Sequence, residues 1–318
     1  MRRLLAAALL LVNAAAFADD APQKTPDDYV YDRPGPLTFI KNIPSDFRDY
    51  GRETFRRENI PIMIGITAAT GLLIWQDQYL VDKSRNLGDH LGISHTQYQK
   101  TFASFTFPGT KKSVGIEGPF DSGSALYFIG DGWTDTIIAG SFLTYGLAAD
   151  NDRAIDTASE MAESVLTSGI VVQTLKHVTG RESPFTTNTP RGNWRFFPNQ
   201  IAYAHNVPKY DAFPSGHFAA ATAVLTVISS NYDEYHWIRP LGWTLIGVLG
   251  FQMMNNGVHW PSDYPLAIAL GYGFGKIAVR KGRHHAGKKE ASLHFLPMVA
   301  PDTLGVQVVS RFGKGGKR

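Results

Sequence analysis

Two histidines and one aspartate in the last third of the sequence are residue types found in phosphoryl-transfer sites. His217 ends the segment Pro-Ser-Gly-His at 214–217, and His259 lies 42 positions later, with Asp263 four residues beyond it. In such a site one imidazole attacks phosphorus and a second protonates the leaving oxygen. These residues therefore predict covalent catalysis through a phosphohistidine.

The spacing of His259 and Asp263 favours a direct interaction between them. Residues four apart in a helical turn lie on one face, so the carboxylate can fix the tautomer of the ring and leave the other nitrogen free to attack. Pro261 sits best in a first helical turn, which places His259 at a helix entrance, exposed to a cleft. A structural hydrogen bond and a metal pair are the alternatives. No third metal ligand is placed nearby, so we expect no metal.

The segment at 214–217 and an upstream lysine predict a binding site for an anion. Ser215 and Gly216 begin an apolar run that is typical of a helix, and a helix N-terminus offers unpaired N–H donors to an anion. Gly216 allows close approach, and His217 just inside the helix can deliver a proton. Lys176 ends an earlier helical pattern and can add a positive charge. An ordinary N-cap serine and a solvated lysine near a helix end are the alternatives.

Taken together, these segments resemble the three signature motifs of the type-2 phosphatidic acid phosphatase superfamily, which also contains bacterial non-specific acid phosphatases and vanadium haloperoxidases. The first motif corresponds to Lys-His-Val-Thr-Gly-Arg-Glu-Ser-Pro at 176–184, and the second corresponds to 214–217. The third corresponds to the segment that contains His259 and Asp263. The order and the spacing of the motifs carry the resemblance, which spans roughly 133–280.

The resemblance implies a helical bundle with its site at one end, and hydrolysis that needs neither a metal nor a cofactor. It implies that His259 is the nucleophile, that Asp263 orients it, and that His217 is the general acid for the leaving group. It also implies that the phosphoryl oxygens are bound by Lys176, Ser215 and Gly216.

Two positions depart from the pattern of the family. Ser183 stands where the first motif has an arginine before its proline, and Met253 stands where the third motif has an arginine six residues before its histidine. Losing one preorganised donor can cost about 10²–10³ in rate, so two losses would leave a feeble catalyst. We predict that Arg181, Arg191 or Arg195 supplies the missing charge. The alternative is that these arginines face solvent or pair with nearby acids.

The preferred function is a phosphohydrolase that cleaves a phosphomonoester or a pyrophosphate: a lipid phosphate, an isoprenoid pyrophosphate or a soluble phosphoester. A degenerate homologue that binds a phosphate or phospholipid without turnover is the alternative, supported by Ser183 and Met253. A haloperoxidase ranks third, because holding vanadate as a stable cofactor demands more cations. A net charge of +3 is too small to imply nucleic acid as a partner.

Apolar periodicity predicts an all-α fold, a single bundle of about five to seven helices. Asp156 or Ser159 can cap the helix that precedes the first motif, and Gly180 ends it. Three glycines between 271 and 275 predict close helix packing and not a phosphate loop, because they follow no strand. The predicted long helices cover 133–149, 156–178, 216–229, 241–254 and 264–279.

Other stretches are less regular. Residues 60–75 are apolar but shorter than the roughly twenty residues of a spanning helix, so we expect a buried core helix, with a membrane contact as the alternative. Residues 82–120 predict loops around short helices, and the long segment 185–213 predicts a functional loop. Residues 293–299 and 306–312 predict a short C-terminal β-hairpin.

Composition and the chain ends define the predicted boundaries. Residues 1–18 have the basic start, apolar run and small-residue site of a signal peptide, which predicts a periplasmic protein; an uncleaved anchor is the alternative. We expect an extended lead-in at 19–57, the helical domain at 58–283 and a basic tail at 284–318. The chain has no cysteine, so no disulfide supports the fold. The basic tail can meet anionic lipid head groups or be solvated.

Overall fold

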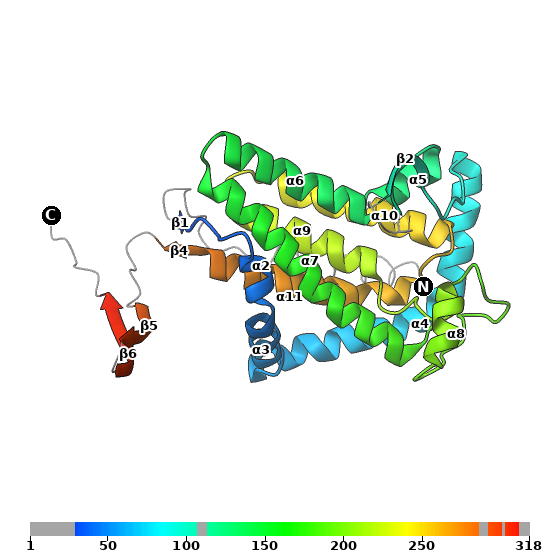
Figure 1. Cartoon of the computed structure of the whole chain (residues 1–318). Helices are drawn as coiled ribbons and strands as arrows, with labels where there is room; N and C mark the ends of the chain where they lie inside the picture. Colours follow the sequence, from blue (N-terminus) through cyan, green and yellow to red (C-terminus); the bar gives the residue numbers. More distant parts are fainter. Residues whose placement is uncertain (1–28, 107–112, 286–291, 301–302, 312–318) are drawn as a thin grey trace.

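The computed structural model describes residues 29–106, 113–285, 292–300 and 303–311. Within these ranges the chain is mostly helical, which confirms the all-α prediction. Ten α-helices are assigned there, and six of them have sixteen or more residues, so the predicted number fits only the long ones. The long helices are α4 (Ile60–Leu91), α6 (Gly132–Ala148), α7 (Asp152–Thr179), α9 (Gly216–Asn231), α10 (Ile238–Asn255) and α11 (Tyr264–Gly282). In Figure 1, α6, α7, α9 and α11 run roughly along the length of the bundle, whereas the cyan part of α4 crosses its right-hand end.

Short elements connect and flank the long helices. The short α-helices are α2 (Thr38–Lys41), α3 (Ile43–Thr54), α5 (Ser122–Phe128) and α8 (Gln200–His205), and the 3₁₀ turns are η2 (Arg57–Asn59), η3 (Val207–Lys209) and η4 (Pro261–Asp263). The strands form three antiparallel pairs: β1 (Tyr29–Tyr31) with β4 (Arg283–His285), β2 (Lys100–Thr106) with β3 (Ser113–Gly118), and β5 (Ser292–Ala300) with β6 (Thr303–Arg311). The last pair confirms the predicted C-terminal hairpin.

Helices α7, α9 and α11 pack against one another and form the centre of the bundle. Their closeness depends on glycine. A Cβ atom on Gly271 of α11 would lie 2.2 Å from the carbonyl oxygen of Ala219 on α9, and a Cβ on Gly275 would lie 2.9 Å from Thr226. The prediction of close packing at these glycines is therefore confirmed. Because α9 begins and α11 is preceded by η4 at one end of the bundle, this packing brings two of the motif segments together.

Helix α7 begins earlier than the sequence suggested. Asn151 is the N-cap and its side chain accepts a hydrogen bond from the backbone N–H of Ala154, so the predicted caps at Asp156 and Ser159 are wrong. Both of those residues lie inside the helix, because the pattern is helical from Asp152 onward. Gly180 ends α7 with φ of 53°, a left-handed conformation that glycine adopts without strain, as predicted.

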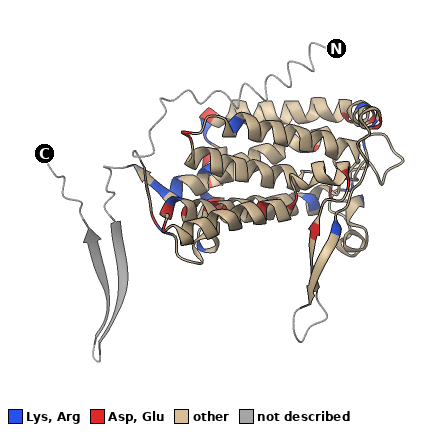
Figure 2. Cartoon of the chain, turned by 90° about the horizontal axis from the view of Figure 1, so that it is seen from above, with Lys and Arg blue, Asp and Glu red and all other residues tan. Residues whose placement is uncertain are grey.

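The prediction of a buried core helix at 60–75 is wrong. These residues form the first half of α4, whose apolar side chains are largely exposed: Ile62 by 60%, Ile64 by 63% and Trp75 by 61%. Helix α4 is, among the described residues, long and apolar enough by length and composition to cross a membrane. Figure 2 shows that most of the ribbon of the long helices carries no charge. Only the second half of α4 contributes buried residues, among them Asp77 and Val81.

Two further expectations need correction, and one lies outside the described residues. Residues 43–54, expected to be extended, form α3, because Phe47 and Tyr50 pack their rings on Phe274 of α11. Residues 82–120 contain the end of α4 and the β2–β3 hairpin in addition to the predicted loops. The predicted signal peptide at 1–18 lies outside the described residues, as does much of the basic tail.

Candidate functional site

His259 lies in the connection between α10 and η4, and its ring is held in one tautomer. Its Nδ1 is 2.7 Å from the carbonyl oxygen of Ala212 and 3.3 Å from Oδ2 of Asp263. A carbonyl can only accept, so Nδ1 carries the proton and donates it. The lone pair is thereby left on Nε2. The predicted pairing with Asp263 is present, but Ala212 makes the closer contact.

The turn around His259 is built by Asp263. Oδ2 of Asp263 accepts a hydrogen bond of 2.8 Å from the backbone N–H of Trp260, while its backbone carbonyl accepts one of 3.0 Å from Ser215. The second contact ties the start of α9 to the start of α11. His259 is only 3% exposed, so the prediction of a histidine exposed to a cleft is wrong. Pro261 opens η4 as the spacing suggested, and Trp260 before it is buried.

His217 is in the first turn of α9, between His259 and an aromatic ring. The ring centroids of the two histidines are 5.9 Å apart and the rings meet edge to face. Tyr127 of α5 lies on the other side of His217, with centroids 4.9 Å apart. His217 is partly exposed whereas His259 is buried. The two imidazoles separated by 42 residues are therefore neighbours, as a two-histidine mechanism requires.

Ser215 and Gly216 form the helix start that the sequence predicted. Ser215 is the N-cap of α9 and its Oγ accepts a hydrogen bond of 3.4 Å from the backbone N–H of Phe218. A Cβ atom on Gly216 would lie 3.9 Å from Nζ of Lys176, so the ammonium group faces the start of α9. Serine, glycine and lysine thus surround one end of α9, whose N-terminus attracts anions.

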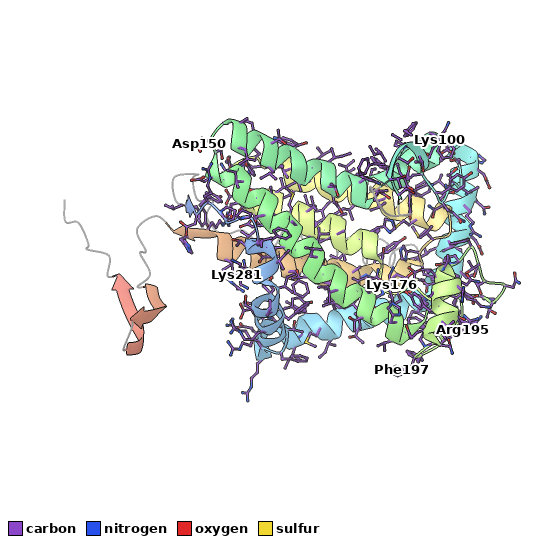
Figure 3. All side chains as sticks on the ribbon, in the orientation of Figure 1. Lys100, Asp150, Lys176, Arg195, Phe197 and Lys281 are labelled. Carbon is purple, nitrogen blue, oxygen red and sulfur yellow. The ribbon has the colours of Figure 1, made fainter. Side chains whose placement is uncertain are left out.

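Lys176 is a buried cation and not a solvated lysine. It is 6% exposed, and its Nζ lies 3.0 Å from Oδ2 of Asp211. In Figure 3, Lys176 and Arg195 lie at one end of the bundle, and Asp150 and Lys281 lie at the other. The position of Lys176 agrees with a site at one end. Asp211 was not predicted as part of it.

Burial and neighbouring charge shift the pKa values of the site. Burial, with smaller contributions from His259 and Lys176, lowers the pKa of His217 to about 3. Burial and Lys176 likewise lower the pKa of His259 to about 3. Burial raises the pKa of Asp263 to about 6, although Arg181 and the N–H of Trp260 oppose the change. Both imidazoles are therefore neutral near pH 7 before any substrate binds.

Arg181 is at the site but does not face the free nitrogen of His259. Its Nη1 donates to Oδ1 of Asp263 at 2.5 Å, and its Nη2 donates to Oδ2 of Asp77 at 2.5 Å. The guanidinium is 0% exposed and stacks between Trp194 and Trp260. Because Asp263 contacts the Nδ1 side of His259, Arg181 lies behind the nucleophile. The guanidinium is thus engaged by Asp77 and Asp263, and the role of Arg181 as a phosphoryl clamp stays a prediction.

The other predicted substitutes also lie away from the histidines. Arg191 is exposed, and Arg195 lies 3.5 Å from Glu182 while it donates to the backbone of Lys209. Both thus fit the alternative of solvent-facing or acid-paired arginines. In the described residues, no contact joins either of them to His217 or His259.

The two positions that replace family arginines are buried. Met253 is 0% exposed, and the hydroxyl of Ser215 points to its Sδ at 3.9 Å. Ser183 is 2% exposed, and its backbone N–H donates to the carbonyl of Pro208 at 3.0 Å. A thioether therefore occupies the place next to Ser215 where the family pattern expects a cation.

Sequence reasoning missed Asp77, Asp211 and the carbonyl of Ala212. Nothing in the sequence distinguishes Asp77 from an exposed acid: it lies two residues after the apolar run that ends at Trp75, and only its burial in the structure requires a cationic partner. Asp211 and Ala212 are in the predicted functional loop, but nothing in their residue types distinguishes them. Among the described residues, no group of three or more His, Cys, Asp or Glu side chains could hold a metal ion.

Comparisons with known proteins match part of the chain to a family. Residues 157–284 match the family model described as PAP2 superfamily. No curated protein matches the chain. Among solved structures, the crystal structure of Aquifex aeolicus LpxE matches with 17% identity and a TM-score of 0.38, covering 50% of this chain and 83% of that chain. The match to the family model contains all three motif segments. The resemblance seen in the sequence is thus confirmed by the match of residues 157–284 to the PAP2 superfamily model.

Proposed function

We propose that this chain is a phosphatase that hydrolyses a phosphomonoester or pyrophosphate through a phosphohistidine at His259. The family match supports a phosphatase of the PAP2 type. The single observation that carries the mechanism is the hydrogen bond from Nδ1 of His259 to Ala212, which leaves the lone pair of Nε2 available. His217, with its ring 5.9 Å away, is the nearest proton donor for a leaving group.

The reaction proceeds in two steps. Nε2 of His259 attacks phosphorus and forms an N–P bond, while the P–O bond to the leaving group breaks and His217 gives its proton to the departing oxygen. Water then attacks phosphorus, His217 takes the proton of that water, and the N–P bond breaks to release phosphate and neutral His259. Lys176, Ser215 and the N–H groups at the start of α9 bind the phosphoryl oxygens.

A second function is favoured by Met253. A buried thioether beside Ser215 cannot neutralise a phosphoryl oxygen, and neither Arg191 nor Arg195 replaces the missing charge. A protein that binds a phosphate or phospholipid without turnover fits this deficit. Lys176 is then the main cation of the binding site, and its ammonium group must contact the bound phosphate as well as Asp211.

The surface supports a substrate with an apolar part. The exposed first half of α4 is uncharged from Ile60 to Trp75. An open apolar depression along α7 is lined by Leu166, Ile170 and Val178 and reaches His177, the neighbour of Lys176. We infer that a lipid phosphate or isoprenoid pyrophosphate reaches the site from a membrane surface, with peripheral contact through α4 on the periplasmic side.

Turnover of a generic aryl phosphate and of a lipid phosphate in detergent tests the proposal. We expect hydrolysis by the wild type and a loss of at least about 10³-fold in His259→Ala, because the nucleophile is removed. His205→Ala is the matched control, since His205 is an exposed histidine at the end of α8. Samples quenched in alkali should also contain phosphohistidine in the wild type, and this phosphohistidine should be lost on treatment with acid.

The same assay separates the alternatives. Phosphate binding by the wild type without hydrolysis of either substrate would establish the binding function and exclude the enzyme. Hydrolysis that persists in His259→Ala would exclude the phosphohistidine mechanism. Faster turnover of the lipid phosphate than of the aryl phosphate would support the apolar substrate.

A further inference from the structure

Arg181 contacts Asp263 on the Nδ1 side of His259, and an aspartate from a distant part of the chain, Asp77, holds it there. Asp77 lies in the second half of α4, 104 residues before Arg181, and accepts a hydrogen bond of 2.5 Å from its Nη2. Nη1 of the same guanidinium contacts Asp263 at 2.5 Å. All three charged side chains are 0% exposed. Buried charges of this kind need hydrogen-bond partners within the protein, because burial removes them from bulk water.

Asp77 also fixes the turn that carries Asp263. Its Oδ1 accepts a hydrogen bond of 3.0 Å from the backbone N–H of Ser262, and its Oδ2 accepts one of 2.7 Å from the hydroxyl of Ser262. That hydroxyl in turn accepts a hydrogen bond of 2.6 Å from Arg181. Hydrogen bonds therefore join Asp77, Ser262 and Arg181 to one another, and Arg181 connects this group to Asp263.

The charges of this group do not cancel. Burial raises the pKa of Asp77 and raises that of Asp263 to about 6. Once both are ionised they bring two negative charges and Arg181 brings one positive charge, which leaves an excess of one negative charge beside His259. When Nε2 of His259 bonds to phosphorus while Nδ1 keeps its proton, the ring becomes positively charged. A negative charge placed beforehand beside that ring stabilises the charge as it develops, at a place that water does not screen.

We propose that Asp77 is a positioning residue for the phosphorylation of His259, which it serves by holding Arg181 and Ser262 against Asp263 and by supplying the excess negative charge. Asp77 does not touch the substrate. The inference rests on the proposed function. It also explains why α4 packs against η4 in the structure.

Asp77→Asn tests this role, because it removes one charge while keeping the size of the side chain. We expect kcat to fall about tenfold or more with KM within about threefold, since the effect arises only as the ring becomes charged. Orthovanadate, which mimics five-coordinate phosphorus, should bind about tenfold more weakly, whereas inorganic phosphate should bind as in the wild type. Asp82→Asn, an exposed carboxylate on the same helix, is the matched control and should change neither.

A double-variant cycle shows whether Asp77 acts through Asp263. In the Asp263→Asn background, we expect Asp77→Asn to change kcat by less than about twofold, because residues that act as a unit are not additive. A full tenfold loss in that background would overturn the proposal, as would a folded Asp77→Asn variant with the kcat and vanadate affinity of the wild type. Circular-dichroism melting establishes folding.

Ser262→Ala decides the matter if Asp77→Asn does not fold. This variant keeps every charge but removes both hydrogen bonds of the Ser262 hydroxyl, to Asp77 and from Arg181. We expect a smaller loss of kcat and of vanadate affinity than in Asp77→Asn, with phosphate affinity unchanged. Wild-type values for Ser262→Ala would overturn the proposal. If the wild type hydrolyses no phosphoester, the proposed function fails, and the vanadate-to-phosphate affinity ratio then tests Asp77 by itself.

Discussion

At the scale of single residues, the site combines a buried histidine, the proposed nucleophile, with a partly exposed one, the proposed proton donor. His259 is fixed by Ala212 and Asp263, whereas His217 lies beside Tyr127 at the start of α9. Their pKa values are lowered to about 3 by burial and by Lys176. The nucleophile is therefore ready over nearly the whole pH range, and the supply of a proton by His217 limits the rate.

This limit predicts an acidic pH optimum. The mechanism needs neutral His259 and charged His217, so kcat/KM should fall as pH rises and peak below the 6.5 of free imidazole. A bound phosphoryl group adds negative charge and raises the pKa of His217, so the descending limb of kcat should lie at higher pH than that of kcat/KM. Hydrolysis measured from pH 3 to 9 tests this, and a flat profile would contradict the two-histidine mechanism.

The sequence was informative about the residues that touch substrate and silent about those that support them. Residue types and spacing led to His217, His259 and Lys176, because few side chains can perform those roles. Asp77 and Ala212 could not be found in this way. One acts through a contact across 185 residues with Ser262, and the other acts through a backbone carbonyl that every residue has.

At the scale of elements, helix packing sets the distance between the motifs. Helices α9 and α11 approach closely at Gly271, and each begins near one of the two histidines of the candidate site. The periodicity of the sequence predicted both helices well, since their apolar faces pack within the bundle. The prediction that the first half of α4 is buried was wrong, because an apolar sequence does not show whether the protein core or the surroundings cover the helix.

Gly271→Ala should separate the two helices. Its Cβ would lie 2.2 Å from the carbonyl oxygen of Ala219, a backbone atom that cannot rotate away. We expect destabilisation of about 1–3 kcal/mol and a matching fall in activity. Gly247→Ala is the control, because nothing lies within 4 Å of that position in α10, and alanine there should stabilise by up to about 1 kcal/mol. Chemical denaturation measures both, and equal stabilities would contradict the packing argument.

The exposed half of α4 should mediate binding to lipid vesicles. Arg52, Arg56 and Arg57 precede it and can contact anionic head groups, while Ile62 and Ile64 offer apolar surface. We expect the double change of Ile62 and Ile64 to Gln to weaken co-sedimentation with anionic vesicles at least about fivefold. Leu87→Gln, on the exposed second half of the same helix, is the control. Equal binding by both variants would place the contact elsewhere.

At the scale of the whole molecule, the two ends of the bundle differ in chemistry. The site lies at the end that carries Lys176, and a group of buried carboxyls lies toward the end that carries Lys281 (Figure 3). A cavity of about 230 Å³ between the β1–α2 connection, α2, α7 and α11 is lined by several of these acids. Burial raises the pKa of Glu163 to about 8, with a further contribution from Asp46 of α3.

These carboxyls predict that stability falls as pH rises. Glu163 faces Asp46, Asn42 and Lys281, and the folded state keeps its proton up to about pH 8 whereas the unfolded state loses it near 4.5. Its contribution is fully present below pH 4.5 and is lost as pH rises through about 8. We expect Tm to fall by several degrees between pH 5 and 8, and Glu163→Gln to flatten this slope. Glu58→Gln, exposed on η2, should leave the slope unchanged.

Because His259 is only 3% exposed, it should react with diethyl pyrocarbonate more slowly than the exposed histidines. His90, His177 and His205 are exposed, so their rings should be acylated first. Mass spectrometry should find several modified histidines while hydrolysis is still intact, and activity lost with the first modification would contradict this order. Surface histidines then offer attachment points for probes on a working protein, since the ring that carries the phosphoryl group is the last to be labelled.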